Sequence, residues 1–82
     1  MDWKTFHPSA FEYDWDKDKL KDHDITFEEA LETFENEYIV RRNKKYIDRY
    51  QLIGKTNGGR NLKIIFQLKA NKIMRIITGW QI

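Results

Sequence analysis

The fold of this chain is decided by residues 44–80, KKYIDRYQLIGKTNGGRNLKIIFQLKANKIMRIITGW. Apolar and polar side chains alternate within this stretch, which is typical of strands with one buried face. The predicted strands are 46–54, 61–68 and 72–79. Residues 57–59, NGG, and then Asn71 tolerate a positive φ, so they predict two tight turns between antiparallel strands. The stretch therefore predicts an antiparallel sheet.

Side-chain parity sorts these strands into two faces. Three-residue loops, NGG and KAN, would pair apolar residues on a core face: Leu52 with Ile64, Tyr50 with Phe66, Met74 with Phe66, and Ile76 with Ile64. The opposite face is called the open face here. Its residues are Arg49, Gln51, Ile53, Lys63, Ile65, Gln67, Ile73, Arg75 and Ile77.

The residues before this sheet predict two short strands and one or two helices. TFEE at 26–29 is a capping box, and apolar residues follow it at helical spacing, which predicts a helix over 27–36 that covers the core face. The other expectations are a loose arm over 1–10, a strand over 11–15, a short exposed helix over 16–24 and a short strand over 38–40. The 82 residues then form a single α+β domain, with an N-terminal strand and one or two short helices on one face of an antiparallel sheet.

Charge is separated along the chain. Residues 1–37 carry a net charge of −8 and residues 38–82 carry +10, which gives the overall +2. Basic strands predict a surface for phosphate groups, although dimerisation through the open face, or its coverage by N-terminal aromatic residues, remain alternatives. Cysteine is absent and no apolar run approaches the roughly 20 residues of a membrane span. These features favour a cytoplasmic protein without contact to membranes.

Three blocks of the sequence resemble the pattern of BrnT-type toxins of type II toxin–antitoxin systems, in the RelE-like superfamily. The blocks are HDITFEEA (23–30), RYQLIGKTNGGRNLKIIF (49–66) and MRIITGW (74–80). The middle block is the most specific, since Ile53-Gly54, Thr56 and Gly59-Arg60 keep the family's spacing, and the resemblance spans about residues 11–79.

This resemblance implies a RelE-like fold and a metal-independent ribonuclease, without a cofactor, that cleaves RNA and arrests translation. A cognate BrnA-type antitoxin would neutralise it and supply the only contact with DNA. A homodimer within the toxin–antitoxin complex stays open.

The sequence also departs from the family pattern. About one helical turn is missing before His23, and Ile47 stands where a glutamate is frequent. Gly79-Trp80 replaces the closing Ala-Arg, and the usual C-terminal helix is absent before Ile82. These departures leave a second interpretation open, in which the chain is a degenerate, non-catalytic module that binds nucleic acid or protein.

The resemblance implies a catalytic set that matches four positions: His23, Arg49, Arg60 and Arg75. Guanidinium groups suit a phosphate whose charge grows during cleavage, and histidine suits proton transfer near neutral pH. The open face adds three RNA-binding candidates: Lys63, Gln51 and Gln67. An ordinary ion pair or a structural histidine is the alternative for each residue. Two distant histidines without cysteine predict no metal site.

Overall fold

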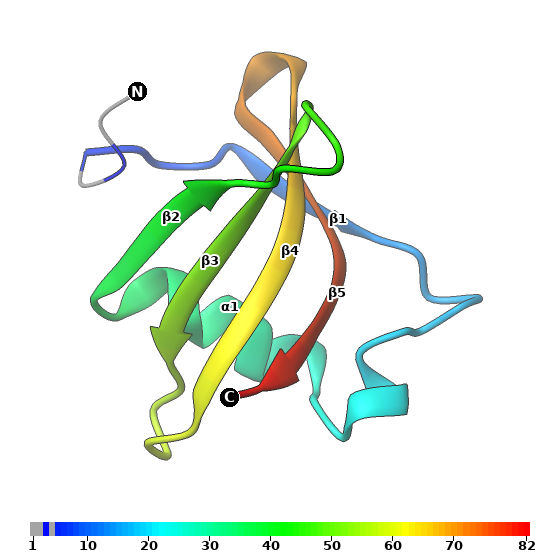
Figure 1. Ribbon diagram of the computed structural model, residues 1–82, viewed down its shortest axis with the longest axis vertical. Helices are drawn as coiled ribbons and strands as arrows, with labels where there is room; N and C mark the ends of the chain where they lie inside the picture. Colours follow the sequence, from blue (N-terminus) through cyan, green and yellow to red (C-terminus); the bar gives the residue numbers. More distant parts are fainter. Residues whose placement is uncertain (1–2, 4) are drawn as a thin grey trace.

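The computed structural model describes residue 3 and residues 5–82. In this part of the chain a five-stranded sheet has α1 against one face (Figure 1). The elements are β1 Ala10–Tyr13, η1 Lys21–His23, α1 Phe27–Glu35, β2 Tyr38–Arg42, β3 Arg49–Lys55, β4 Asn61–Lys69, η2 Ala70–Lys72 and β5 Ile73–Gln81. The α+β class is confirmed.

The sheet has the order β1-β5-β4-β3-β2 and is mixed. β2 to β5 are antiparallel, whereas β1 runs parallel to β5. The expected purely antiparallel sheet is therefore wrong at this edge, and the N-terminal strand belongs to the sheet rather than packing on one of its faces. The chain leaves β1, passes through α1 beneath the sheet and enters the opposite edge at β2, so β1 meets the last strand rather than its sequence neighbour.

The first hairpin has the predicted register, since Tyr50 lies opposite Phe66 and Leu52 opposite Ile64. The second hairpin turns one residue later than predicted. Asn71 and Lys72 both have a positive φ, and Lys69 pairs with Ile73. Met74 therefore faces Leu68 and Ile76 faces Phe66, which corrects the predicted Met74–Phe66 and Ile76–Ile64 pairs. The register differs by two residues, so the faces are preserved.

A β-bulge interrupts β5 opposite the step from Ile65 to Phe66. Ile76 pairs with Phe66 but Thr78 pairs with Ile65, which leaves Ile77 as the extra residue. Beyond it Trp80 lies opposite Lys63 on the open face, and Gly79 faces the core. A methyl group on Gly79 would lie 2.6 Å from Ile64 Cδ1. Only glycine fits this close approach without a shift of its neighbours.

The predicted capping box starts α1. The Thr26 hydroxyl accepts from the Glu29 amide, and the Glu29 carboxylate accepts from the Thr26 amide, both at 3.1 Å. The helix ends at Glu35, one residue before the predicted end. No helix in residues 3 and 5–82 is long and apolar enough to cross a membrane.

Phe66 lies at the centre of the core and is fully buried. It contacts the rings of Trp3, Phe34 and Tyr50 at centroid distances of 5.7, 5.5 and 5.5 Å. The other buried members of the cluster are Leu20, Ile25, Ala30, Leu52, Leu62, Ile64, Met74 and Ile76. All but Leu20, Ile25 and Ala30 come from the sheet.

The N-terminal arm lies partly outside the described residues, because positions 1, 2 and 4 do. Within the described part, Trp3 and Phe6 pack against the core. The Trp3 carbonyl accepts a 2.8 Å hydrogen bond from the Tyr38 hydroxyl. These two aromatic residues thus hold the segment against the sheet, which differs from the expected loose arm.

Candidate functional site

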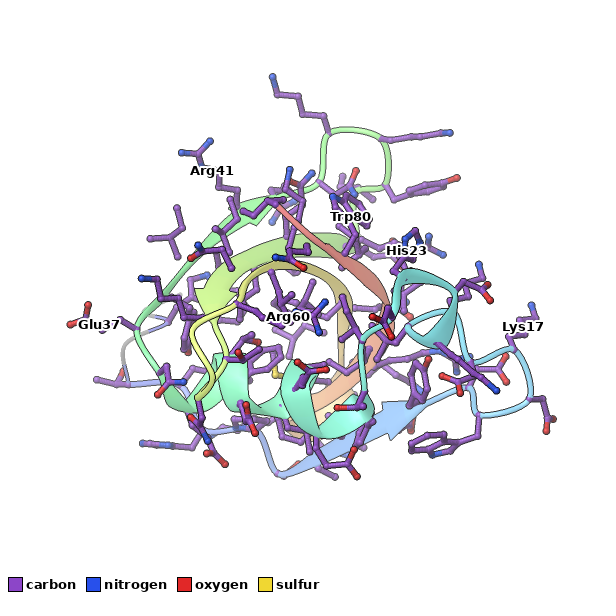
Figure 2. The ribbon with its side chains drawn as sticks, turned by 90° about the horizontal axis from the view of Figure 1, so that it is seen from below. Lys17, His23, Glu37, Arg41, Arg60 and Trp80 are labelled. Atoms are coloured by element: carbon purple, nitrogen blue, oxygen red, sulfur yellow. The ribbon has the colours of Figure 1, made fainter. Side chains whose placement is uncertain are left out.

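The open face of the sheet lies on the side away from α1. Figure 2 shows Arg41, Trp80 and His23 on this side, with α1 on the other. The described N-terminal aromatic residues Trp3, Phe6, Phe11 and Tyr13 pack with the core cluster on the helix side. The strand register places the predicted residues of β3, β4 and β5 on this face together.

Arg49, Gln67 and Arg75 form one cross-strand row, which we call the arginine row. Gln67 of β4 pairs with Arg49 of β3 on one side and with Arg75 of β5 on the other. Neighbouring strands are about 4.8 Å apart, so the two arginine backbones are separated by about 10 Å. Two long guanidinium side chains at this spacing can reach one phosphate from opposite sides.

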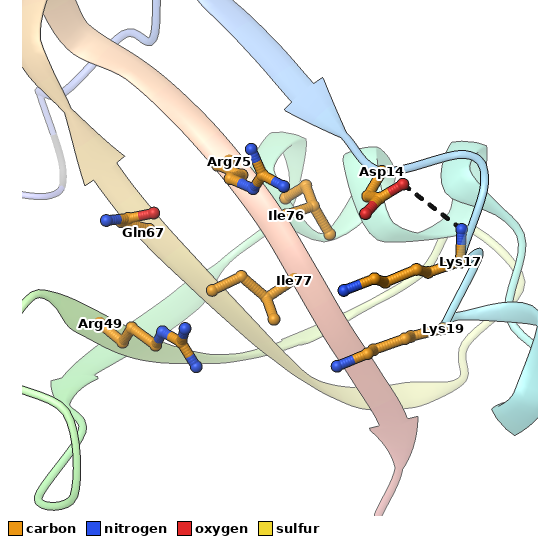
Figure 3. Close-up of a pocket in the computed structure, with 8 residues that line it drawn as sticks. All are labelled: Asp14, Lys17, Lys19, Arg49, Gln67, Arg75, Ile76 and Ile77. Carbon is orange, nitrogen blue, oxygen red and sulfur yellow. Dashed lines mark hydrogen bonds between the residues drawn. The ribbon is translucent and has the colours of Figure 1, made fainter.

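Arg49 is oriented by Tyr46. Its guanidinium carbon lies 4.3 Å from the centroid of the Tyr46 ring, in cation–π geometry. Its Nε is buried and has no hydrogen-bond partner among the described residues. A buried donor without a partner is costly. The terminal guanidinium nitrogens point across the face toward Ile77 (Figure 3).

Lys17 and Lys19 add two cations that the sequence analysis missed. Both side chains extend over β5 toward Ile77, facing the arginine row (Figure 3). A pocket of about 150 Å³ lies between these groups. Its lining residues are Asp14, Lys17, Lys19, Arg49, Gln67, Arg75, Ile76 and Ile77. The sequence offered little signal for the two lysines, because residues 15–17 form a turn and Asp18, between the two lysines, has a φ of 40°.

The segment that carries these lysines is latched at both ends. The Tyr13 hydroxyl donates to the Asp18 carboxylate at 2.6 Å and accepts from the Leu20 amide at 2.9 Å. Burial, followed by the hydrogen bond to Asp18, raises the pKa of Tyr13 to about 12. Leu20 is fully buried in the core. This anchoring replaces most of the expected helix over 16–24, of which only η1 is present.

The cations of the open face are unpaired. Two ion pairs occur within residues 3 and 5–82, Arg60–Glu29 and Lys69–Glu12, both at 2.8 Å. Neither involves the five cations that surround the pocket or lie farther along the face, namely Lys17, Lys19, Arg49, Lys63 and Arg75. Asp14 is the one carboxylate that lines the pocket in the described part of the chain, against four cations, so the net positive charge there attracts an anion.

Arg60 lies apart from this group. Its guanidinium donates to the Glu29 carboxylate at 2.8 Å and to the Asp24 carbonyl at 3.1 Å, and it also contacts Gln81. The Thr26 amide and the Arg60 guanidinium hold the pKa of Glu29 below its ordinary value. Arg60 therefore joins the start of α1 to the end of β5, and its charge is already matched.

His23 and Lys63 lie at the other end of the open face. The His23 ring is 6.0 Å from the Trp80 ring, and Lys63 Nζ is 5.9 Å from the Trp80 centroid. Lys63 is four residues along β4 from Gln67, which corresponds to about 13 Å. His23 thus lies at the Trp80 end of the face, away from the arginine row. Gln51 pairs with Ile65 in the cross-strand row next to the arginine row.

The open face therefore presents a cationic pocket at one end and an aromatic platform at the other. Phosphate oxygens suit the guanidinium and ammonium groups, and a nucleobase suits the Trp80 ring. Neither a model of a known protein family nor a curated protein matches this chain. Within the described residues, no group of three or more His, Cys, Asp and Glu side chains gathers to hold a metal ion.

Proposed function

We propose that the protein is a RelE-like endoribonuclease of the BrnT type, which binds single-stranded RNA across the open face. The observation that carries this proposal is the arginine row, whose two guanidinium groups have no ion-pair partner among the described residues and line one pocket together with Lys17 and Lys19. The toxin would act in the cytoplasm, need no cofactor and be held inactive by a BrnA-type antitoxin.

In this proposal the scissile phosphate occupies the pocket between Arg49 and Arg75. The ribose 2′ oxygen attacks phosphorus, the bond to the 5′ oxygen breaks, and a 2′,3′-cyclic phosphate forms. The two guanidinium groups stabilise the negative charge that grows on the phosphoryl oxygens. No water enters the step, so the reaction requires one proton acceptor and one proton donor.

Asp14 is the carboxylate among the described lining residues of the pocket, so it is the acceptor nearest to the 2′-hydroxyl. Lys17 or Lys19 would supply the proton to the departing 5′ oxygen. His23, whose ring lies 6.0 Å from the Trp80 ring, would contact a neighbouring nucleotide beside Trp80 rather than the scissile group.

A cleavage assay on the purified protein tests this proposal. A labelled single-stranded RNA should be cut in the presence of a chelator, and Arg49→Ala or Arg75→Ala should each lower the rate about 100-fold or more. Lys55→Ala is the matched control, because it removes the same charge from the same strand about 20 Å from Arg49. An RNA with 2′-deoxyribose at the cleavage site should bind but stay intact. Cleavage that survives both arginine substitutions would overturn the proposed site.

A non-catalytic RNA-binding module is the second candidate. The placement of His23 away from the arginine row favours it, because the residue best suited to proton transfer is then missing from the pocket. Salt-sensitive RNA binding that depends on Arg49 and Arg75, without any cleavage, would establish this module instead. Growth arrest on expression, reversed by co-expression of a small DNA-binding partner, would support the toxin.

A further inference from the structure

The outer edge of β2 offers unpaired backbone groups. β2 is the last strand of the sheet, and within the described residues no segment pairs with its outer side (Figure 1). The Asn43 amide donates to the Arg49 carbonyl, which fixes the alternation of hydrogen-bonded pairs between β2 and β3. By this alternation Ile39 and Arg41 bond inward to β3. The amides and carbonyls of Tyr38, Val40 and Arg42 point outward.

The side chains along this edge are complementary to the same series in reverse order. Ile39 and Arg41 lie on the open face, and Glu37, the residue just before β2, continues the same alternation, which gives the order acid, apolar, base. Ile39 is 52% exposed, and Glu37 and Arg41 are exposed as well. Figure 2 shows both at the β2 edge, with Arg41 extending toward the open face and Glu37 extending outward from the edge. Tyr38 and Val40 alternate with them on the core face.

We propose that a second copy of this chain pairs with β2 in antiparallel orientation, about a two-fold axis through Ile39. In this register Glu37 lies opposite Arg41 of the second copy, and Ile39 lies opposite its own equivalent. Tyr38 lies opposite Val40 of the second copy on the other face. Each of these opposed pairs is an ion pair or an apolar pair, and Tyr38 and Val40, two of the three outward-pointing residues of each copy, form about four backbone hydrogen bonds.

The neighbouring registers are less favourable. A two-fold axis at Arg41 would oppose Arg41 to its own equivalent, and like charges directly opposite are destabilising. An axis at Val40 would place Ile39 against a guanidinium and remove the ion pair of Glu37. A shift to odd registers would set outward backbone groups against inward ones. The charge pattern therefore selects one arrangement.

The proposed dimer joins two sheets of five strands each into one continuous sheet. Because the axis is perpendicular to the sheet, both open faces lie on the same side. The contact is short, and interfaces well below about 1,200 Å² are weak and transient. We therefore expect dissociation on dilution and in high salt.

Sedimentation equilibrium of the purified protein tests the proposal. Wild type should show a monomer–dimer equilibrium, and Glu37→Arg or Arg41→Glu alone should weaken it about tenfold or more, because each creates two repulsive pairs. An equimolar mixture of these two variants should form a heterodimer at least as stable as the wild-type dimer, because both ion pairs are restored. This rescue cannot arise from misfolding of either variant.

Control substitutions exclude a general charge effect. Glu28→Arg and Lys72→Glu change exposed charges away from β2, so each should dimerise as wild type does and their mixture should show no added association. Val40→Pro removes an outward-pointing amide and should abolish the dimer while β2 stays paired with β3. A wild-type protein that is monomeric at every accessible concentration, or variants that fail to form the heterodimer, would overturn the proposal.

Discussion

The two faces of the sheet differ although the same strands build both. Phe66 and Gln67 are consecutive residues of β4, yet Phe66 is fully buried among aromatic rings and Gln67 lies between two unpaired arginines. On the core face each large side chain is matched by its neighbours. On the open face Arg49, Arg75 and Lys63 have no ion-pair partner among the described residues. Along one strand, residues of one parity thus stabilise the core, and residues of the other parity are available to bind a ligand.

Two arginines show the same contrast. Arg60 is satisfied by Glu29, the Asp24 carbonyl and Gln81, whereas Arg75 has no ion-pair partner among the described residues. Both residues resemble family positions in the sequence, and only the structure distinguishes their roles. A matched arginine contributes to folding, and an unmatched one is available to a ligand.

The largest expected effect lies on the core face. Phe66→Ala should lower the free energy of unfolding by about 3–5 kcal/mol, because it leaves a cavity among Trp3, Phe34 and Tyr50. Gln67→Ala, one residue along, should cost less than about 1 kcal/mol, since it loses one exposed hydrogen bond to Asp48. Urea denaturation measures both. Equal losses in the free energy of unfolding for the two variants would contradict the assignment of Phe66 to the core face and Gln67 to the open face.

The next comparison sets Arg60 against Arg75. Arg60→Ala should cost about 1–2 kcal/mol of stability, because it leaves Glu29 and the Asp24 carbonyl without their donor, and it should leave RNA affinity unchanged. Arg75→Ala should leave stability within about 0.5 kcal/mol of wild type and reduce the salt slope of RNA binding by about 1. Unfolding curves and binding titrations at several salt concentrations measure the two effects. The reverse pattern would contradict the assignment of the site.

A smaller effect is expected at Tyr13, which packs against the core cluster and binds Asp18 and the Leu20 amide. Tyr13→Phe removes the bonds to Asp18 and Leu20 and should cost about 1 kcal/mol. Because the latch positions Lys17 and Lys19, RNA affinity should also fall, by less than in Arg75→Ala. Tyr46→Phe is the control, since it keeps the ring against which Arg49 packs. Unchanged RNA binding in Tyr13→Phe would remove Lys17 and Lys19 from the site.

The smallest effect concerns pH. The pKa of Glu29 is lowered in the folded protein, so its contribution to stability is present above the ordinary value of 4.5 and is lost as the pH falls through the folded pKa. Glu29→Gln should remove this part of the acid dependence, whereas Glu28→Gln should keep it. Thermal unfolding between neutral and acidic pH measures the difference. Identical acid profiles of wild type and Glu29→Gln would exclude this coupling.

Much of the sheet could be predicted because short-range rules decide it. Alternation predicted the strands of residues 49–81 and their faces as far as Ile76, and the capping box predicted the start of α1. The bulge at Ile77 was not predicted, and it reverses the faces of the residues after it. The pairing register of the second hairpin differs by two residues from the prediction, because the turn comes one residue later. Lys72 shares the positive φ of Asn71, which no composition rule requires. The parallel pairing of β1 depends on the path through α1, which strand periodicity does not encode.

The candidate site was predicted only in part. Parity placed Arg49, Gln67 and Arg75 on one face. It did not reveal Lys17 and Lys19, because their position depends on the tertiary latch of Tyr13 and on the burial of Leu20. It also could not show that Arg60 is bound to Glu29, since that contact joins residues 31 positions apart.

The extra residue at Ile77 has a practical consequence. By reversing the parity of the strand end, the bulge lifts one indole out of the hydrophobic interior and sets it beside Lys63 on the exposed surface. With Trp3 and Trp15 replaced by phenylalanine, Trp80 becomes a built-in fluorophore. Its emission would report occupancy of the basic surface directly, without any attached label.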